Sequence, residues 1–264
     1  RRPPRSTLFP YTTLFRSVSG IAGEISGETL LVSASKGIEN DSLQTMAEVI
    51  GECLGPKSRQ RLTFLSGPSF AREVAAEMPT AVVAASSDGQ AATTTQEVFS
   101  TPYFRVYTND DVMGVELGGA LKNVIALAAG VSDGLGFGYN TRAALITRGL
   151  AEMNRMGLAL GANPATFAGL AGMGDLVLTC TGDLSRNRTV GMELGRGRTL
   201  AEILAGMKMV AEGVKTTLSA YQLACRLGVD MPITEQMYRI LYENKDPRQA
   251  VTDLMLRGLK AEAA

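Results

Sequence analysis

Short apolar runs and amphipathic stretches alternate in the first part of the chain. Apolar runs that end in glycine, proline or polar turn residues predict buried strands. Such runs lie at Thr29–Ser35, Arg61–Ser66, Thr80–Ser86 and Phe104–Thr108. Apolar residues at three- and four-residue steps between them predict helices at Asp41–Leu54, Ser69–Glu77 and Ala91–Phe99. Strands that alternate with helices are typical of an α/β sheet.

After Asn109 the apolar residues keep helical spacing to the end of the chain, and strand signals almost vanish. A capping residue before a helix former or a proline predicts helix starts at Asn163–Pro164, Thr199 and Asp246–Pro247. Helix ends or turns are predicted at Gly161, Gly206 and Gly228. We therefore expect two domains: a partial dinucleotide-binding domain with an incomplete Rossmann-type sheet at 18–111, and an all-helical substrate-binding and catalytic domain at 112–264.

Residues 1–17 differ from the rest of the chain. They are basic, rich in serine and threonine, and free of acidic side chains, and the first residue is not methionine. The stretch from Thr7 to Ser17, TLFPYTTLFRS, resembles the translation of a common sequencing adapter. We therefore expect a non-native leader fused to an N-terminally truncated chain. A transit peptide, which is also basic and poor in acidic residues, is the alternative.

Composition excludes several classes of function. The 26 basic and 26 acidic residues cancel, and no basic patch is visible, which argues against nucleic-acid binding. No apolar run reaches the length of a membrane span and no signal peptide is evident, so we expect a cytoplasmic protein. The three cysteines are widely spaced and have no C-x-x-C or Cys/His pattern, which predicts reduced, mostly buried thiols and no metal site.

The chain contains no histidine, the side chain that usually transfers protons near neutral pH. A lysine with a lowered pKa or a carboxyl group with a raised one must then do this work. Lys122 is the only charged residue between Glu116 and Asp133, within a stretch that has the pattern of an amphipathic helix with a broad apolar face. Its amine either extends to solvent or acts as a buried acid–base group.

The segment Gly172–Arg188 combines a glycine turn with polar side chains. Asp175 could cap the following helix or accept a hydrogen bond from a substrate hydroxyl. Ser185, Arg186 and Asn187 supply a hydroxyl, a guanidinium and an amide, the donors that hold a phosphate, although a tetrapeptide of this kind also occurs in exposed loops.

Two predicted strands end in residues suited to a ligand. Lys36 follows the first strand, and Gly67-Pro68-Ser69 follows the second. In open α/β sheets, ligands bind outside the carboxyl ends of the strands, although Lys36 alone also fits a solvated turn. The chain has no G-x-G-x-x-G motif, the turn that places a pyrophosphate on a helix N-terminus, and Gly134–Gly138 has the spacing of a flexible turn.

Taken in order, several blocks resemble the bacterial NAD(P)-dependent glycerol-3-phosphate dehydrogenases. The blocks are Ser35–Glu39, Leu65–Glu73, Phe104–Asn109, Gly118–Val124, Ser132–Gly138, Thr141–Met153, Gly172–Arg188 and Met231–Glu235. The resemblance implies an enzyme that reduces dihydroxyacetone phosphate to sn-glycerol 3-phosphate for phospholipid synthesis, and a possible homodimer.

The resemblance also implies residue roles. Lys122 matches the proton acceptor, and we expect burial and a nearby Arg186 to lower its pKa. Contacts with glycerol 3-phosphate are implied for Lys36, Gly67, Ser69, Asp175, Ser185, Arg186 and Asn187. Contacts with NAD or NADP are implied for Ala71, Arg186, Val210 and Glu212.

The family's glycine-rich turn has no counterpart in this chain. We therefore expect an incomplete cofactor site, weak NAD(P) binding and no activity in this chain. Two other functions stay open at this stage. One is a non-catalytic fragment that serves as a helical dimerisation module. The other is a different lysine-dependent dehydrogenase, of the 6-phosphogluconate or 3-hydroxyacid type, which would need a different loop from the one at 185–187.

Overall fold

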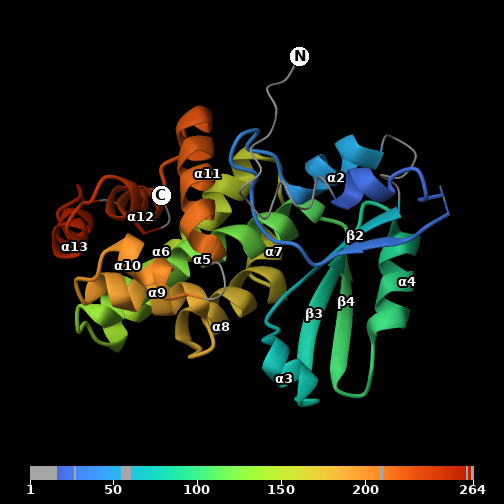
Figure 1. The fold of residues 1–264 in the computed structure, drawn as a ribbon, viewed down its shortest axis with the longest axis horizontal. Coiled ribbons are helices and arrows are strands. Elements are labelled where there is room, and N and C mark those ends of the chain that lie inside the picture. Colours follow the sequence, from blue (N-terminus) through green and yellow to red (C-terminus); the bar gives the residue numbers. More distant parts are fainter. Residues whose placement is uncertain (1–16, 27, 55–60, 208–210, 260, 263–264) are drawn as a thin grey trace.

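The computed structural model describes residues 17–26, 28–54, 61–207, 211–259 and 261–262. The expected leader lies outside these residues, except for Ser17, where a short helical turn over 17–21 begins. The described strands form one sheet in the order β1-β2-β3-β4 (Figure 1). They span Leu31–Ser33, Leu62–Ser66, Thr80–Ala85 and Phe104–Asn109, which confirms the four predicted strands.

The sheet is mixed. β1 runs parallel to β2, and β3 runs parallel to β4, but β2 and β3 are antiparallel, with Phe64 opposite Ala85. An antiparallel pair within a largely parallel sheet is common in α/β proteins, because neighbouring strands of opposite direction need only a short connection. The carboxyl ends of β1 and β2 therefore lie at one edge, and those of β3 and β4 lie at the opposite edge.

The helices of this part are α2 (Met46–Leu54), α3 (Ala71–Ala75) and α4 (Gly89–Phe99), and α4 packs on β4. Two predicted helices are shorter than expected. The first begins at Met46 instead of Asp41, because Leu43 has a left-handed φ of 58° and a bridge joins Ile38 to Thr45. The second ends before Glu77, which has a φ of 57°.

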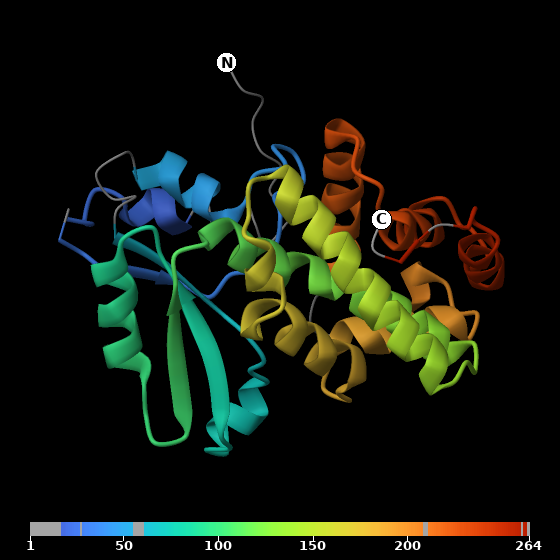
Figure 2. The same cartoon turned by 180° about the vertical axis from the view of Figure 1, so that it is seen from behind.

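From Val112 onward the described residues form helices only. In chain order they are α5 (Val112–Gly134), α6 (Tyr139–Ala159), α7 (Pro164–Phe167), the π-helical turn η2 (Leu170–Gly174), α8 (Asp175–Thr181), α9 (Arg186–Gly195), α10 (Leu200–Ala205), α11 (Glu212–Leu227), α12 (Pro232–Tyr242) and α13 (Pro247–Met255). Figure 2 shows α6, in yellow-green, lying across the helical part. The change from strands to helices falls where the boundary at residue 112 was placed, and the division into domains stays a prediction.

The predicted capping residues sit at helix ends. Asn163, Thr199 and Asp246 each accept a hydrogen bond from the first turn of the following helix, and Thr199 completes a capping box with Glu202. Gly228 ends α11 with a left-handed φ of 66°. The helix starts and stops of this half were therefore readable from local sequence.

α5 is the central helix of the molecule. All its residues from Gly114 to Ser132 are buried, so it has no exposed polar face, unlike the amphipathic helix that was predicted. By length and composition α5 could cross a membrane, but 83% of its most apolar window is buried by other elements of the same chain. A helix that is apolar all round is then a core helix.

A glycine seam joins α5 to α9, the pair of helices that pack most extensively. It consists of Gly130 and Gly134 on α5 and Gly191 and Gly195 on α9. A Cβ atom at any of the four would overlap a backbone carbonyl oxygen of the opposite helix. Small residues four apart let helix backbones approach this closely. Gly134 was predicted to lie in a flexible turn, but it ends α5 inside this seam, and the turn itself covers 135–138.

Candidate active site

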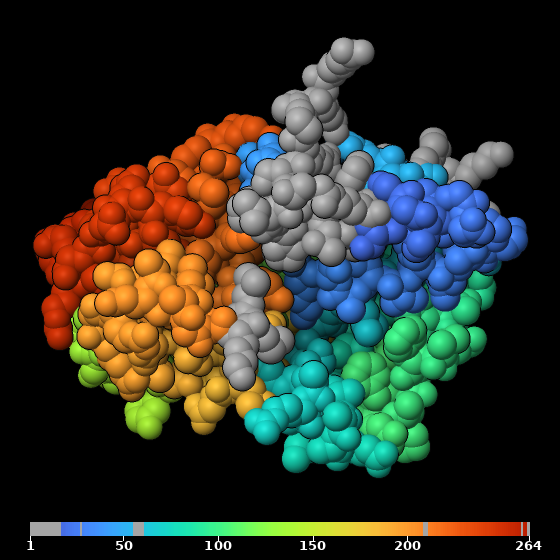
Figure 3. Space-filling view, viewed as in Figure 1, coloured from blue at the N-terminus to red at the C-terminus, as the bar shows by residue number. Residues whose placement is uncertain are grey.

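Three charged side chains from distant parts of the chain meet where α5 passes the ends of β1 and β2. The Lys122 amine and the Lys36 amine each donate to the Asp175 carboxylate, Lys36 Nζ to Oδ2 at 2.7 Å and Lys122 Nζ to Oδ1. Lys122 is only 8% exposed and Asp175 only 1%. In the space-filling view, the sheet part, on the right, and the helical part, on the left, lie against each other (Figure 3). Each part contributes one of the two lysines.

One carboxylate shared by two ammonium groups leaves an excess positive charge in a buried place. Burial, and after it the positive charge of Lys36, lower the pKa of Lys122, while Asp175 raises it; the net result is a pKa of about 8. The lowered pKa confirms the expectation for Lys122, but the cation responsible was wrongly identified. Arg186 instead pairs with Glu212 at 3.3 Å, on a more exposed side of the site. The solvent-directed alternative for the Lys122 amine is likewise wrong.

Asp175 does not cap a helix. It is the first residue of α8, and the capping position is Gly174, which has no side chain. The preceding π-helical turn directs the Asp175 carboxylate inward to the lysines, and Thr179 Oγ1 donates to the Asp175 backbone carbonyl at 2.6 Å. The alternative interpretation, a hydrogen-bonding group within a polar site, agrees with this geometry.

Ser185, Arg186 and Asn187 form the N-terminus of α9. Ser185 is the capping residue, and its Oγ accepts the N–H of Arg188 at 3.2 Å. The Asn187 amide donates to Asn123 Oδ1 and accepts from the N–H of Gly213, both at 2.9 Å. Ser185 and Asn187 are buried, so the exposed-loop interpretation is wrong for both. Unpaired N–H groups at a helix N-terminus favour an anion such as phosphate. The N-terminus of α9 lies near Lys122, because Asn187 contacts Asn123, the residue that follows Lys122 on α5.

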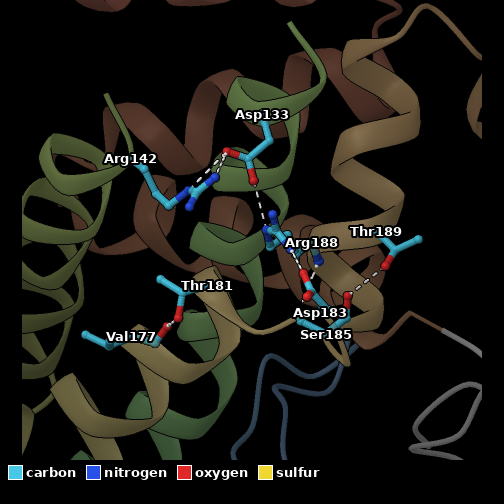
Figure 4. A network of polar contacts seen from close by, with 8 residues as sticks. All are labelled: Asp133, Arg142, Val177, Thr181, Asp183, Ser185, Arg188 and Thr189. Carbon is cyan, nitrogen blue, oxygen red and sulfur yellow. Dashed lines mark hydrogen bonds and ion pairs between the residues drawn. The ribbon is translucent and has the colours of Figure 1, made fainter. Parts of the chain in front are cut away.

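A network of ion pairs fixes the loop before α9 (Figure 4). Arg188 donates through Nε to Asp133 at 2.8 Å and through Nη1 to Asp183 at 2.9 Å. Arg142 holds the other oxygen of Asp133 at 2.6 Å. The network ties the end of α5, the start of α6 and the α8–α9 loop together, so Ser185 is held from both sides.

The loop after β2 reaches the same site. Gly67 has a φ of 136°, and a Cβ atom there would lie 3.0 Å from the Cα of Val82, so the turn requires glycine. Ser69 Oγ donates to the carbonyl of Gly67 at 3.1 Å. The ring of Phe70 lies against Gly182, where a Cβ atom would come within 2.5 Å of Cε2. The structure therefore brings Gly67 and Ser69 toward α8, on the strand edge that carries Lys36.

The residues expected to contact a nicotinamide cofactor are more open. Ala71 begins α3 and is exposed, and the Arg186–Glu212 pair joins the N-termini of α9 and α11. Val210 lies outside the described residues. Open polar groups beside the buried lysines fit the nicotinamide end of a dinucleotide, whereas no described strand is followed by the G-x-G-x-x-G turn that would hold its pyrophosphate.

No cluster of acidic and cysteine side chains in the described part of the chain could hold a metal ion. Among the three cysteines, which are all free thiols, Cys180 is buried and Cys53 is half-buried. Cys225 is exposed. Burial raises the pKa of the Cys180 thiol to about 12, so it stays protonated.

Sequence reasoning missed several residues of the site. Asn123 and Thr179 contact Asn187 and Asp175, and Glu116 lies buried on α5 near Lys36. Asn123 could have been found as the only polar neighbour of Lys122 in its apolar helix. Thr179 follows Asp175 by one helical turn, which the spacing also shows.

A Rossmann-type sheet beside a helical part, with a buried low-pKa lysine where the two meet, is typical of dehydrogenases that use a nicotinamide dinucleotide. Two family models match the chain: the N-terminus of NAD-dependent glycerol-3-phosphate dehydrogenase over residues 8–92, and its C-terminus over residues 111–252. The chain belongs to this family, as the resemblance predicted, and the family consists of oxidoreductases.

Named relatives and solved structures agree. Glycerol-3-phosphate dehydrogenase (NAD(P)+) from Syntrophotalea carbinolica is 71% identical over 235 residues, which cover 89% of this chain and 71% of the relative. The enzyme of the same name from Geobacter metallireducens is 72% identical over 232 residues, 88% of this chain and 69% of the relative. The crystal structure of glycerol-3-phosphate dehydrogenase from Coxiella burnetii has a TM-score of 0.87 at 42% identity and covers 93% of this chain and 74% of its own.

Proposed function

We propose that the chain interconverts sn-glycerol 3-phosphate and dihydroxyacetone phosphate with NAD or NADP, and that Lys122 transfers the proton. The observation that carries the proposal is the buried cluster of Lys122, Asp175 and Lys36. The names of the relatives supply the substrate and the cofactor. Neither the expected inactivity of the chain nor the two alternative functions find support in the comparisons.

Lys122 suits both directions of the reaction. In oxidation, the neutral Nζ takes the proton of the substrate hydroxyl at C2. A nicotinamide held near Ala71, Arg186 and Glu212 would supply the hydride acceptor for that carbon. In reduction, the protonated amine donates a hydrogen bond to the carbonyl oxygen and then its proton to the forming alkoxide. A pKa of about 8 leaves both forms of Lys122 populated near neutral pH, so one residue serves both directions.

Asp175 and Lys36 hold the base and the substrate in register. Asp175 fixes the Lys122 amine through its Oδ1, and Lys36 limits how much of the positive charge Asp175 can neutralise. We place the substrate phosphate at the N-terminus of α9, with Ser185, Arg186 and Asn187 as donors, and the rest of the substrate beside Gly67 and Ser69.

The cofactor contacts are proposed at Ala71, Arg186, Val210 and Glu212. Arg186 would then serve both ligands, since it stands between the N-terminus of α9 and Glu212. We further propose a cytoplasmic enzyme of phospholipid synthesis that acts as a homodimer. Size-exclusion chromatography with light scattering tests the dimer, and calorimetry with NADH and NADPH tests the cofactor preference.

The deciding experiment measures Lys122→Ala in a direct assay that follows NADH oxidation in the presence of dihydroxyacetone phosphate. Loss of a general acid lowers kcat by about 10²–10⁴-fold. The matched control is Lys245→Ala, because Lys245 is also a partly buried lysine paired with an aspartate, Asp253, but lies at the α12–α13 end. Retention of most of kcat in Lys122→Ala would remove Lys122 from the mechanism.

A further inference from the structure

Behind Lys36 lies a small polar pocket that the proposed reaction does not use. Its walls include Lys36, Phe64, Ser66 and Glu116, and it has room of about 10 Å³. That is close to the space one water molecule needs. The pocket lies between the end of β2, the segment after β1 that carries Lys36, and α5.

Two buried polar atoms in this pocket lack hydrogen-bond partners among the described residues, Ser66 Oγ and Glu116 Oε2. Ser66 is 5% exposed and Glu116 is 8% exposed. Leaving such groups unpaired costs free energy, so buried polar atoms nearly always pair with protein or with an ordered water. Two polar atoms around a space of this size meet the usual requirement of a buried water.

The other oxygen of Glu116 is already in use. Glu116 Oε1 accepts the N–H of Ala47 at 2.9 Å, in the first turn of α2. Burial raises the pKa of the Glu116 carboxyl to about 7. Hydrogen bonds from the Thr45 side chain and from the N–H groups of Ala47 and Met46 lower it, and the negative charge of Glu48 on α2 adds to the rise. Near neutral pH this carboxyl is therefore partly ionised.

Lys36 links the pocket to the catalytic cluster. Its stem crosses α5 at Gly119, where a Cβ atom would lie 3.3 Å from Lys36 Cδ and 3.0 Å from Ser66 Oγ. Gly119 lies one helical turn after Glu116 and one turn before Lys122. From the pocket, the Lys36 side chain extends to Asp175. The charged groups nearest to Glu116 are therefore Glu48 on α2 and Lys36 on the β1–α2 segment. The Asp175–Lys122 pair lies on the other side of Lys36.

We propose that Ser66 and Glu116 bind one internal water molecule behind Lys36, and that Glu116 acts through Lys36 as a positioning residue for proton transfer at Lys122. The water accepts from Ser66 Oγ and donates to Glu116 Oε2. The Glu116 carboxylate then places a negative charge behind the two lysines and stabilises their charged forms. This inference rests on the proposed role of Lys122 as the proton acceptor.

The test compares Glu116→Gln with Glu152→Gln. Glu152 on α6 is a matched control, because burial also raises its pKa to about 7, and it also accepts backbone N–H groups at the start of another helix, those of Ile233 and Thr234 at the start of α12. Glutamine keeps an acceptor oxygen in both variants. Only Glu116 faces the pocket behind Lys36.

Two readouts are measured on the full chain. One is the pH at which kcat/KM for glycerol 3-phosphate oxidation reaches half of its plateau, and the other is the titration of Lys122 followed by NMR of lysine labelled with carbon-13, without ligands. Glu116 and Lys122 are six positions apart on α5, a rise of about 9 Å. Loss of a charge at that range lowers both values by about half to one pH unit in Glu116→Gln. Glu152→Gln leaves both unchanged.

An unchanged Lys122 titration in Glu116→Gln, or an equal shift in Glu152→Gln, overturns the role of Glu116. If Glu116→Gln does not fold, Ser66→Ala replaces it, because that change removes a ligand of the water and leaves the contact with Ala47 intact. Ser66→Ala should shift the titration in the same direction by a smaller amount, and no shift would again overturn the role. A high-resolution structure without density between Ser66 Oγ and Glu116 Oε2 overturns the water site. The Lys122 titration is read without turnover, so these outcomes are separate from a failure of the proposed reaction.

Discussion

Replacing Lys122, the residue proposed to transfer the proton, should make the protein more stable while it abolishes turnover. Lys122→Met keeps the length and the apolar stem of the side chain and removes the charge. The folded protein lowers the pKa of Lys122 from 10.5 to about 8, mainly because it buries the amine. Each pKa unit corresponds to about 1.4 kcal/mol, so keeping this lysine protonated costs the folded state about 3 kcal/mol at pH 7.

The effect has a defined pH dependence. The pKa of Lys122 is 10.5 in the unfolded chain and about 8 in the folded protein. The free energy of unfolding of the wild-type protein is therefore highest above pH 10.5, where Lys122 is neutral in both states. It decreases as the pH falls from 10.5 through about 8. The methionine variant has no such loss. Its advantage is therefore greatest below pH 8 and fades toward pH 10.5.

Thermal unfolding by circular dichroism measures the difference. For a chain of this size, about 3 kcal/mol corresponds to roughly 6–12 °C in Tm. A Lys122→Met variant that melts at or below the wild-type temperature at pH 7 would refute the reasoning, because it would show that the ion pair with Asp175 outweighs the burial of the charge.

Three further outcomes follow from individual contacts. Gly118→Ala should destabilise the fold by about 2–3 kcal/mol in urea titrations, because its Cβ would lie 2.5 Å from a backbone carbonyl of η2. In Gly119→Ala the added Cβ meets only the flexible stem of Lys36 and the side chain of Ser66. This variant should therefore raise KM with little change in the free energy of unfolding. Arg188→Lys should raise KM for glycerol 3-phosphate about tenfold, with a smaller effect on kcat. A lysine cannot hold the carboxylates of Asp133 and Asp183 at the same time, so the loop before α9 would lose one of its ion pairs. An unchanged KM would contradict this. Folding raises the pKa of the buried Glu152 carboxyl from 4.5 to about 7. The protonated carboxyl therefore adds about 3 kcal/mol to the free energy of unfolding below pH 4.5, and this is lost as the pH rises through 7. In Glu152→Gln, the free energy of unfolding should change less between pH 4.5 and 7.

Local sequence predicted the elements well, because strands, caps and turns depend on neighbouring residues. The four strands, the capping residues and the glycine that ends α11 all lie where pattern reasoning placed them. The antiparallel pairing of β2 and β3 was not visible, since strand direction depends on how a connection crosses the sheet. The start of α2 was also missed, because a left-handed Leu43 is not readable from residue type.

The sequence singled out the residues of the candidate site, but it did not show their arrangement. Lys122 was identified because a lone charge in an apolar helix and a lack of histidine leave few alternatives. Its contact with Asp175 joins residues 53 positions apart, and the contact of Lys36 with Asp175 joins residues 139 apart. No local pattern encodes such separations, so the choice of Arg186 as the neighbouring cation was wrong. Glu116 was overlooked because its burial is a property of packing.

The glycine seam has a consequence for how the enzyme opens. Because α5 and α9 touch through their backbones, we expect the helix that carries Lys122 and the helix end proposed to bind the phosphate to move as one rigid body. Motion that admits substrate then falls between this body and the sheet, across the ion pair of Lys36 with Asp175. Opening would expose Lys122 and withdraw Lys36, and burial and the charge of Lys36 are the two causes that lower the pKa of Lys122; closing would restore both. The seam therefore ties the strength of the base to the position of the sheet, so that the lysine is best able to lose its proton when the substrate is enclosed.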